Sequence, residues 1–395
     1  MSWPLVKLES VSVFIRNGAS IKQSGDAAGL AITRIETIAD RTVNLDKCGY
    51  ADVSENEYLN YRLRFGDILV SHINSEKHLA KCAIFESDRS DIVHGMNLLC
   101  LRPNYEVVFP KYLFHYLSSP EFLKFIPAIT KKSVNQASFT VSAFKDLEIP
   151  LPSLAEQKRI AAILDKADAI RRKRQQAIQL ADDFLRAVFL EMFGDPVTNP
   201  KGWEVARLGD VVESQLGKML SQKAKEGKSP KKYLRNANVR WRKFSLDDLL
   251  EMDFNSKELK KFELKNGDLL VCEGGDVGRC SIWRDNIADC YYQKALHRVR
   301  PSYEVLTPEY LQEYFFWMSK RGGLTDSVSE VTFSHLTAEK LKELRIPLPP
   351  IDFQIQFSCK YRKIDALMSR YESVVSVEND NFSSISQKAF SGAIK

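Results

Sequence analysis

Segments in the first half of the chain return in its second half, in the same order and at a nearly constant distance. Residues 147–152, Leu-Glu-Ile-Pro-Leu-Pro, return as Leu-Arg-Ile-Pro-Leu-Pro at 344–349, an offset of 197. Residues 66–70, Gly-Asp-Ile-Leu-Val, return as Gly-Asp-Leu-Leu-Val at 267–271, an offset of 201. A period this long lies far outside the roughly 20–50 residues of solenoid repeats. The chain is therefore a tandem duplication of a whole domain.

Shorter echoes with an offset near 200 support the duplication. Trp3 returns as Trp203, and residues 102–103, Arg-Pro, return at 300–301. The other repeated positions are Tyr105 and Tyr303, Pro110 and Pro308, Tyr112 and Tyr310, and Tyr116 and Tyr314. At 395 residues the chain is long enough for two or three domains, each with its own core.

The composition is that of a globular protein. Hydrophobic residues make up 44% of the chain. No stretch reaches the ~18 apolar residues of a membrane span, and the first residues lack the features of a signal peptide, so we expect a cytoplasmic protein without a membrane partner. The seven cysteines include no Cys-x-x-Cys pair, which argues against a disulfide framework and a zinc site. The net charge of +6 slightly favours polyanionic partners, but it does not by itself identify a partner.

Each copy begins with a mixed α/β domain of about 150 residues, in which short β-like runs lie between turn signals. A helix follows from Pro110 or Pro308, since proline is well tolerated in a first helical turn. A further amphipathic segment, residues 139–147 or 336–344, leads into the Ile-Pro-Leu-Pro element. The expected strands are residues 67–70, 83–85 and 96–101 in the first copy, and 269–272, 280–283 and 296–300 in the second.

After each Ile-Pro-Leu-Pro element the apolar residues fall three and four apart, which is the spacing of a heptad seam. Each segment runs about 40 residues without proline, so each helix is roughly 60 Å long at ~1.5 Å per residue. A helix that long cannot bury its apolar stripe on its own module, and we expect the two helices to pair antiparallel. The basic run 171–174 interrupts the first seam, and a solvated face is favoured there over a DNA or partner contact. The seam residues are Ile160, Leu164, Ala167, Ile178, Ala181, Leu185, Val188 and Met192, then Phe357, Tyr361, Ile364, Met368, Tyr371, Val375, Phe382 and Ile385.

The boundary between the copies lies just after the first long helix. Gly194 can cap that helix, and Pro196 and Pro200 forbid its continuation. The expected fold class is mixed α/β, with two tandem domains joined by two long antiparallel coiled-coil helices. The expected bounds are 1–152 for the first domain, 153–194 for the first helix, 195–349 for the second domain and 350–395 for the second helix.

The usual patterns of catalytic sites are missing. Residues 227–229, Gly-Lys-Ser, look like the end of a phosphate-binding loop, but Gln222 stands where that motif needs a glycine. Asp253 and Glu258, with a nearby lysine, suggest a metal-dependent nuclease, although chance is the better explanation in so charged a segment. The glycine-rich run 274–278 fits a tight turn better than a dinucleotide fold. The residues alone favour a non-enzymatic protein.

The order of these motifs resembles the specificity subunit of type I restriction-modification systems. The match extends over essentially the whole chain. The residues that carry it are 66–70, 147–152, 156–161, 193–203, 267–275 and 293–298. One position departs from the pattern, because the second copy has Asp-Phe-Gln at 352–354 where the first has Ala-Glu-Gln at 155–157. We therefore expect the second helix to hold its neighbours differently from the first.

The resemblance implies that the two domains are target-recognition domains, each reading one half of a bipartite, asymmetric site in duplex DNA. The helices would set the spacing of the half-sites and dock methyltransferase subunits, expected to number two, and restriction/translocase subunits would complete the complex. This chain would be a non-catalytic subunit without a cofactor, and S-adenosylmethionine, ATP and Mg²⁺ would be bound by the partners. Two similar readers on an antiparallel pair are related by an approximate two-fold axis, so we expect half-sites about one helical turn, some 34 Å, apart.

Sequence readout needs side chains with paired donors and acceptors, while phosphate contacts need cations and small donors. The resemblance places the polar segments 218–232 and 233–241 of the second domain near the DNA. The candidate DNA-binding residues of the second domain are Lys218, Ser221, Lys223, Tyr233, Arg235, Asn236, Asn238, Arg240, Glu273, Gly274 and Arg279. Those of the first domain are Lys22, Gln23, Arg34, His72, Asn74, Ser75, Lys77, Lys131, Asn135 and Gln136.

Two other functions stay open. A self-contained DNA nuclease or methyltransferase with an unrecognised site would show activity when the purified protein is given metal or S-adenosylmethionine. A coiled-coil scaffold that binds only proteins leaves unexplained why the duplicated domains differ most in their polar loops while the helices keep their seam. Salt-sensitive binding of duplex DNA separates this scaffold from a DNA reader, because phosphate contacts release counterions.

Overall fold

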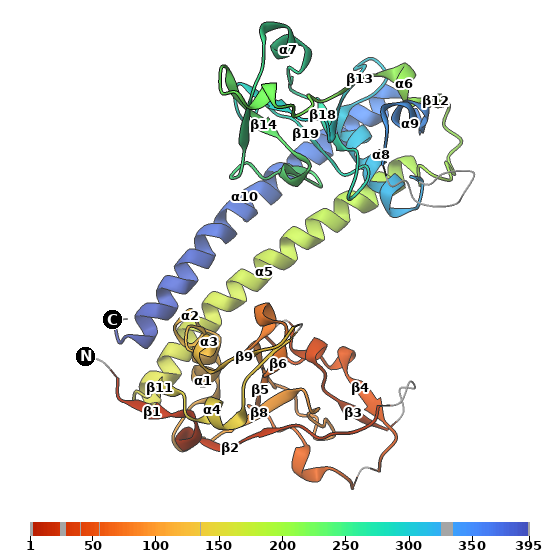
Figure 1. The fold of residues 1–395 in the computed structure, drawn as a ribbon. Coiled ribbons are helices and arrows are strands. Elements are labelled where there is room, and N and C mark those ends of the chain that lie inside the picture. The colour runs from red at the N-terminus through yellow and green to blue at the C-terminus, as the bar shows by residue number, and fades with distance from the viewer. Residues whose placement is uncertain are drawn as a thin grey trace. The chain divides into compact units, whose positions relative to one another are not determined.

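The computed structural model describes residues 3–23, 29–39, 41–54, 56–134, 136–324 and 335–393, except the side chains of 375–381 and 383. The chain divides into two compact units (Figure 1). The first unit contains residues 1–175 and 373–395, and the second contains residues 176–372. Each unit holds one α/β module and parts of both long helices, α5 (Leu154–Phe193) and α10 (Ile351–Phe390).

The first module is built on a four-stranded antiparallel sheet with the order β2-β8-β5-β7. Ile68 and Val70 point into a core shared with the helix α1 (Pro110–Leu117), while Leu69 points into a second core on the other face. Because both faces are covered, these strands read as unbroken apolar runs rather than alternating ones. The strands are β2 (Ser12–Asn17), β8 (Leu98–Pro103), β5 (Ile68–Ser71) and β7 (Cys82–Ile84).

The second module repeats this sheet, with the order β13-β21-β18-β19, all antiparallel. Leu269 and Val271 pack toward α8 (Pro308–Lys320), and Leu270 and Cys272 pack on the opposite face. The three strands expected in each copy are therefore confirmed, whereas β2 and β13 were not anticipated. The strands are β13 (Val212–Leu216), β21 (Leu296–Pro301), β18 (Leu269–Cys272) and β19 (Cys280–Ile282).

The first two residues of each Ile-Pro-Leu-Pro element lie at the end of a short strand that closes its module. In the first module β11 (Glu148–Pro150) pairs with β1 (Leu5–Lys7), and in the second β22 (Arg345–Pro347) pairs with β12 (Val205–Arg207). The repeated tyrosines hold these strands in place. The Tyr112 hydroxyl donates to the Pro150 carbonyl at 2.7 Å, and the Tyr310 hydroxyl donates to the Pro347 carbonyl at 2.8 Å.

The remaining elements are small. In the first module they are β3 (Leu30–Ile32), β4 (Gly49–Ala51), β6 (Ile73–Asn74), β9 (Lys131–Lys132), β10 (Ala137–Ser138), α2 (Pro120–Leu123), α3 (Ile126–Ile129) and α4 (Val141–Lys145). In the second module they are β14 (Pro230–Leu234), β15 (Val239–Arg240), β16 (Lys243–Phe244), β17 (Leu250–Asp253), β20 (Cys290–Tyr292), α6 (Leu208–Val211), α7 (Ser256–Lys261) and α9 (Ala338–Glu343).

The two long helices run antiparallel within each unit. In the first unit the start of α5, with Leu164, shares a core with Phe390 near the end of α10. In the second unit the Phe193 ring, at the end of α5, lies 5.4 Å from the Phe357 ring near the start of α10. The expected mixed α/β fold with two modules and an antiparallel helical pair is thus confirmed.

The expectation that the second helix holds its neighbours differently is wrong for the glutamine contacts, which are the same in both copies. The Gln157 side chain accepts from the Phe109 backbone N–H at 2.7 Å and donates to the Val107 and Pro152 carbonyls. The Gln354 side chain makes the same three bonds, accepting from Thr307 at 3.0 Å and donating to the carbonyls of Val305 and Pro349. The residue that differs, Glu156 in the first copy and Phe353 in the second, takes no part in these bonds. Glu156 pairs instead with Arg159 on its own helix.

The basic run in α5 is only partly solvated. Arg171 and Arg172 pair with the buried Asp168 at 2.5 and 2.8 Å, and the Arg171 guanidinium lies over the Phe382 ring. This half of the run therefore stabilises the helical pair of the first unit.

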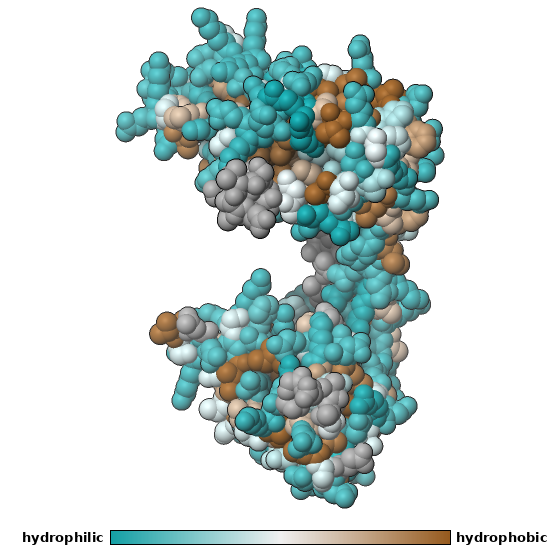
Figure 2. All heavy atoms as spheres, turned by 90° about the vertical axis from the view of Figure 1, so that its right-hand side faces the viewer, coloured by the Kyte–Doolittle hydropathy of each residue, from teal (hydrophilic) through white to brown (hydrophobic). Residues whose placement is uncertain are grey.

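The face of the molecule drawn in Figure 2 is mostly hydrophilic, with apolar patches on both units. Among the described residues, no helix combines the length and the apolar run that crossing a bilayer requires.

Candidate nucleic-acid interface

A hollow of about 290 Å³ lies in the first module beside the edge strand β2 and its neighbour β8. Its walls are the chain just after β2, the turn before β8 and the segment that follows β3. The residues that line it are Ala19, Ser20, Ile21, Gln23, Ile32, Thr33, Arg34, Ile35, Glu36, Gly95, Met96 and Asn97.

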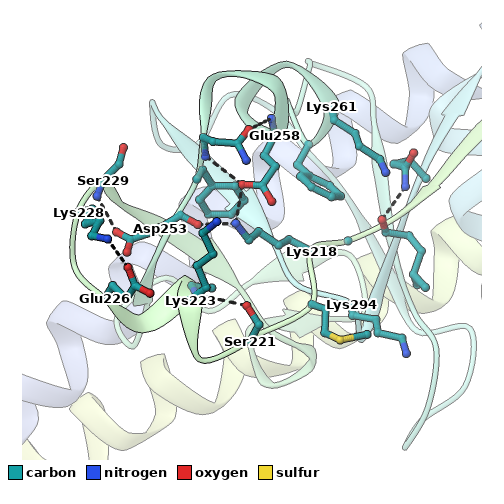
Figure 3. A pocket seen from close by; sticks show the side chains of 18 residues that line it. Lys218, Ser221, Lys223, Glu226, Lys228, Ser229, Asp253, Glu258, Lys261 and Lys294 are labelled. Carbon is teal, nitrogen blue, oxygen red and sulfur yellow. Dashed lines mark hydrogen bonds and ion pairs between the residues drawn. The ribbon is translucent and has the colours of Figure 1, made fainter.

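A larger hollow of about 700 Å³ lies in the second module, beside β13 and β21 (Figure 3). It is rich in lysine, with Lys218, Lys223, Lys228, Lys261 and Lys294 on its walls. Glu226, Asp253 and Glu258 are its acidic residues, and Phe254 and Phe262 also line it.

The two hollows occupy equivalent places in the duplicated fold. In the first module the Ala19 N–H donates to the His94 carbonyl at 2.9 Å, and in the second the Lys218 N–H donates to the Tyr292 carbonyl at 3.1 Å. The residue before each, Gly18 or Gly217, passes so close to the turn before β8 or β21 that a Cβ atom would lie 2.1 or 2.3 Å from a carbonyl oxygen. Only glycine allows this approach, so both copies build the same backbone along this side of the hollow. The remaining wall differs, because it comes from residues 32–36 in the first module and from residues 253–262 in the second.

The first hollow offers planar, paired donors and acceptors. The Arg34 guanidinium and the Gln23 side-chain oxygen both lie over the face of Gly49, where a Cβ atom would come within 2.5 Å of each. Arg34 is half-buried and its Nε has no hydrogen-bond partner among the described residues. Arginine and amide side chains of this kind can read guanine and adenine edges through two hydrogen bonds.

The second hollow offers point charges. The Lys218 ammonium already has two partners within the module, because it donates to Glu258 at 2.6 Å and to the Asp253 carbonyl at 2.7 Å. Burial acts to raise the pKa of Glu258, but the Asn255 backbone N–H and the Lys218 ammonium outweigh it, so the pKa is lowered and the carboxylate stays charged. Lys223, Lys261 and Lys294 make no ion pair with described residues. These three ammonium groups are the available cations of the hollow.

A second polar cluster lies at the ends of β14 and β18 in the same module. The Asn236 amide donates to the Gly274 carbonyl at 2.7 Å, and Arg279 donates to the backbone and side-chain oxygens of Asn236 at 3.1 Å. Arg235 pairs with Asp248 at 2.6 Å. Arg240 is exposed, and the Glu273 side chain is half-buried. Ser221 lies at the rim of the hollow, where its hydroxyl accepts from the Ala224 N–H.

In the first module the small sheet β6-β10-β9 brings several candidate residues together. Asn74 pairs with Ala137 in this sheet, and Lys131 pairs with Ser138. Gln136 closes the hairpin, since its carbonyl accepts from the Ser133 N–H at 2.8 Å. Lys22, Ser75, Lys77, Lys131 and Gln136 are exposed, and Asn74 is half-buried. Asn135 lies outside the described residues.

Three candidate side chains are buried, and we leave them out of the DNA-facing set; Gly274, which has no side chain, is buried as well. Tyr233 is 2% exposed and belongs to the core beneath β18. Asn238 is 1% exposed, and its amide accepts from the Arg235 N–H and donates to the carbonyls of Ser245 and Asp248. His72 packs against Phe139, and burial lowers its pKa, so it is neutral at pH 7. Each of these side chains packs inside its module rather than presenting a group to a ligand.

The structure adds residues that were not among the DNA-binding candidates of the sequence. Lys261 and Lys294 line the larger hollow, and Asn97 lines the smaller one. Lys294 comes from the turn before β21 and Lys261 from the end of α7, so neither lies in the lysine-rich segment that drew attention in the sequence. The available signal was the duplication itself, because Lys294 and Met96 occupy equivalent positions 198 residues apart beside the two hollows.

The acidic residues of the larger hollow do not form a metal site. Asp253 accepts from the Ser229 backbone N–H at 2.6 Å, and Glu258 accepts from Lys218 and the Asn255 N–H. In the part of the chain that the structure describes, no group of three or more His, Cys, Asp or Glu residues could hold a metal ion.

The chain contains two copies of one α/β module. Each copy has a polar hollow beside its equivalent strands and is followed by a 40-residue helix. This architecture defines a duplicated ligand-binding protein whose two modules are joined by a pair of long helices. The chain belongs to the family described as the type I restriction modification DNA specificity domain, whose model matches residues 3–180 and again 200–359. It is a specificity subunit with two tandem recognition domains, and such subunits provide the DNA sequence specificity of type I systems and are not catalytic.

Curated relatives and solved structures agree with this family. The chain is 30% identical over 384 residues to the putative type I restriction enzyme MjaX specificity subunit of Methanocaldococcus jannaschii, covering 93% of this chain and 87% of that one. It is 25% identical over 317 residues to the EcoBI specificity subunit of Escherichia coli, covering 71% and 65%. The fold matches the type I S subunit from M. genitalium with a TM-score of 0.60 at 15% identity, over 99% of this chain and 96% of that one. A chain from a structure of type I complex assembly matches with a TM-score of 0.54 at 17% identity, over 100% and 98%.

Proposed function

We propose that the two modules bind duplex DNA through their hollows and the polar residues around them, each reading one half of a bipartite, asymmetric site. The observation that carries this proposal is that both copies have a polar hollow beside the same two backbone segments, yet line it with different side chains. The first presents Arg34 and Gln23, and the second presents Lys223, Lys261 and Lys294. Two domains that read different DNA sequences require similar backbone geometry at the site and different polar side chains in it.

We further propose that α5 and α10 set the distance between the half-sites and dock two methyltransferase subunits. Leu180 and Phe184 lie one turn apart on α5 and are 68% and 59% exposed, and Leu367 of α10 is also exposed. Apolar side chains at such positions suit a protein partner. Adenine methylation and cleavage would then be carried out by methyltransferase and restriction/translocase subunits that bind S-adenosylmethionine, ATP and Mg²⁺.

The proposal is tested by mapping modified adenines across the genome. Cells that carry this chain with its methyltransferase partner are compared with cells that lack only this chain and with cells in which the wild-type chain is restored from a plasmid. We expect one bipartite, asymmetric motif that disappears with the chain and returns with the plasmid. A motif that persists without the chain would overturn the proposal, and methylation by the purified chain alone would support a self-contained methyltransferase instead.

A further inference from the structure

One ion cluster occurs in both modules with its charges reversed. In the first module it consists of Glu86, Lys111 and Asp165, and in the second of Arg284, Glu309 and Arg362. The second set follows the first by 198, 198 and 197 residues, which is the period of the duplication. Every position therefore carries the opposite charge in the other copy.

In the first unit the cluster joins the module to α5. Lys111, in the first turn of α1, donates to Glu86 at 2.9 Å and to Asp165 of α5 at 3.0 Å. All three side chains are about one-third exposed, at 34%, 34% and 37%. His115, one turn further along α1, donates to the other oxygen of Asp165 at 2.7 Å.

In the second unit the reversed cluster joins the module to α10. Glu309, in the first turn of α8, accepts from Arg284 at 3.1 Å and from Arg362 of α10 at 2.8 Å. The Glu309 side chain has no exposed surface, so its carboxylate depends on these two guanidinium groups. A buried carboxylate that loses its cationic partners is strongly destabilising.

Two other contacts between each module and its helices occur in both units. Gln157 and Gln354 make identical sets of hydrogen bonds. The Phe390 ring lies 5.6 Å from the Tyr112 ring, and the equivalent Phe193 ring lies 4.8 Å from the Tyr310 ring. These apolar and amide contacts cannot distinguish one helix from the other, and the reversed ion cluster can.

We propose that the charge-reversed clusters make each recognition module specific for the first turns of its own helix, so that a module and the helix start up to Asp165 or Arg362 form one exchangeable unit. A module joined to the other helix at the repeated Ile-Pro-Leu-Pro element would place Glu309 against Asp165, or Lys111 against Arg362. Like charges facing each other at a partly buried contact repel and stay unpaired. The inference concerns assembly of the chain and does not rest on how the modules read DNA.

Charge variants of the full chain, purified with its methyltransferase partner, test the proposal. Lys111→Glu places three carboxylates together and is expected to lower the melting temperature by roughly 5 °C, the size expected for a lost, partly buried ion pair in a unit of this size. The triple variant Glu86→Arg, Lys111→Glu, Asp165→Arg rebuilds the cluster of the second module and is expected to restore most of this loss. Lys158→Glu, on an exposed position of α5, is the matched control and is expected to have little effect. A triple variant that melts no higher than Lys111→Glu would overturn the proposal.

Two chimaeric chains test the exchange unit directly. In the early-join chain residues 203–349 replace residues 3–152, and in the late-join chain residues 203–362 replace residues 3–165. We expect the late-join chain to melt at a higher temperature, and Asp165→Arg to raise the melting temperature of the early-join chain toward it. A late-join chain no more stable than the early-join chain, or an Asp165→Arg change without effect, would contradict the proposal.

Discussion

Arg242 donates two hydrogen bonds to Glu313, at 2.7 and 2.5 Å, and the Glu313 side chain has no exposed surface. Arg242 also pairs with Asp182 of α5, so one guanidinium connects the loop after β15 to both α8 and the long helix. Its backbone has a φ of 64°, in the left-handed region that a residue with a side chain rarely adopts. Such a conformation persists only where the surrounding contacts hold it.

Replacing Arg242 by alanine leaves the Glu313 carboxylate buried without its cation. We expect Arg242→Ala to lower the free energy of unfolding by about 3–5 kcal/mol. Arg235→Ala is the matched control, since its partner Asp248 is 76% exposed, and it is expected to cost no more than about 1 kcal/mol. Urea unfolding followed by tryptophan fluorescence measures both. Equal losses for the two variants would contradict this account of the contact.

The equivalent glutamines of the two long helices are expected to have equal importance. Gln157→Ala and Gln354→Ala each leave one backbone N–H and two carbonyls without their partner, and each is expected to cost about 2–4 kcal/mol. Glu156→Ala removes only a surface ion pair and is expected to cost less than about 1 kcal/mol. A large effect of Glu156→Ala with little effect of Gln354→Ala would restore the idea that the second helix is held differently.

The buried Glu309 gives the second unit an acid-sensitive contribution to stability. Burial acts to raise the pKa of Glu309, but the hydrogen bond and charge of Arg362 outweigh it, so the pKa is lowered. A carboxyl whose pKa is lower in the folded state stabilises that state above the unfolded pKa, ~4.3, and loses the contribution as the pH falls through the folded value. The melting temperature of the wild type should therefore exceed that of Glu309→Gln at pH 7, and this difference should shrink toward pH 3.

Exposed Glu304 is the control for this pH series. Glu304→Gln should melt close to the wild type at every pH. If the difference in melting temperature between the wild type and Glu309→Gln did not depend on pH, the stabilisation would come from the packing of the side chain and not from its charge.

The lysines of the larger hollow are expected to contact phosphates. In the complex with the methyltransferase partner, each of Lys223→Ala, Lys261→Ala and Lys294→Ala should reduce the slope of log affinity against log salt by about 0.9 if it removes one phosphate contact. Lys158→Ala, on α5, should leave the slope unchanged. Fluorescence anisotropy of a labelled duplex over a range of salt concentrations measures these slopes. Slopes that are the same for all four variants would place the phosphate contacts elsewhere.

The scaffold could be predicted from the sequence because the duplicated residues are those that build it. Gly66 and Gly267 have φ of 85° and 92°, as a turn entering a strand requires, and the aspartate after each pairs with an arginine of the neighbouring strand. Residues that form turns and ion pairs of this kind are repeated in both copies. The edge strands β2 and β13 were missed because most of their residues are half-buried or exposed and several carry polar side chains.

The candidate site could be predicted only in part. The density of lysine, arginine and asparagine in the second module marked a region that borders the larger hollow. It could not show that Tyr233 and Asn238 turn inward, because the direction of a side chain depends on the register of β14 and on a tight turn. Lys261 and Lys294 reach the hollow from separate segments, and only the folded backbone brings them together with Lys223.

The central claim is that each module reads its own half of the site through its own hollow. The most direct test maps methylated adenines in cells that carry either Gln23→Ala with Arg34→Ala, or Lys261→Ala with Lys294→Ala. We predict that the first pair relaxes or changes one half of the bipartite motif, that the second pair affects only the other half, and that the gap between the halves stays the same. Both halves changing together in either variant, or an unchanged motif in both, would contradict the claim.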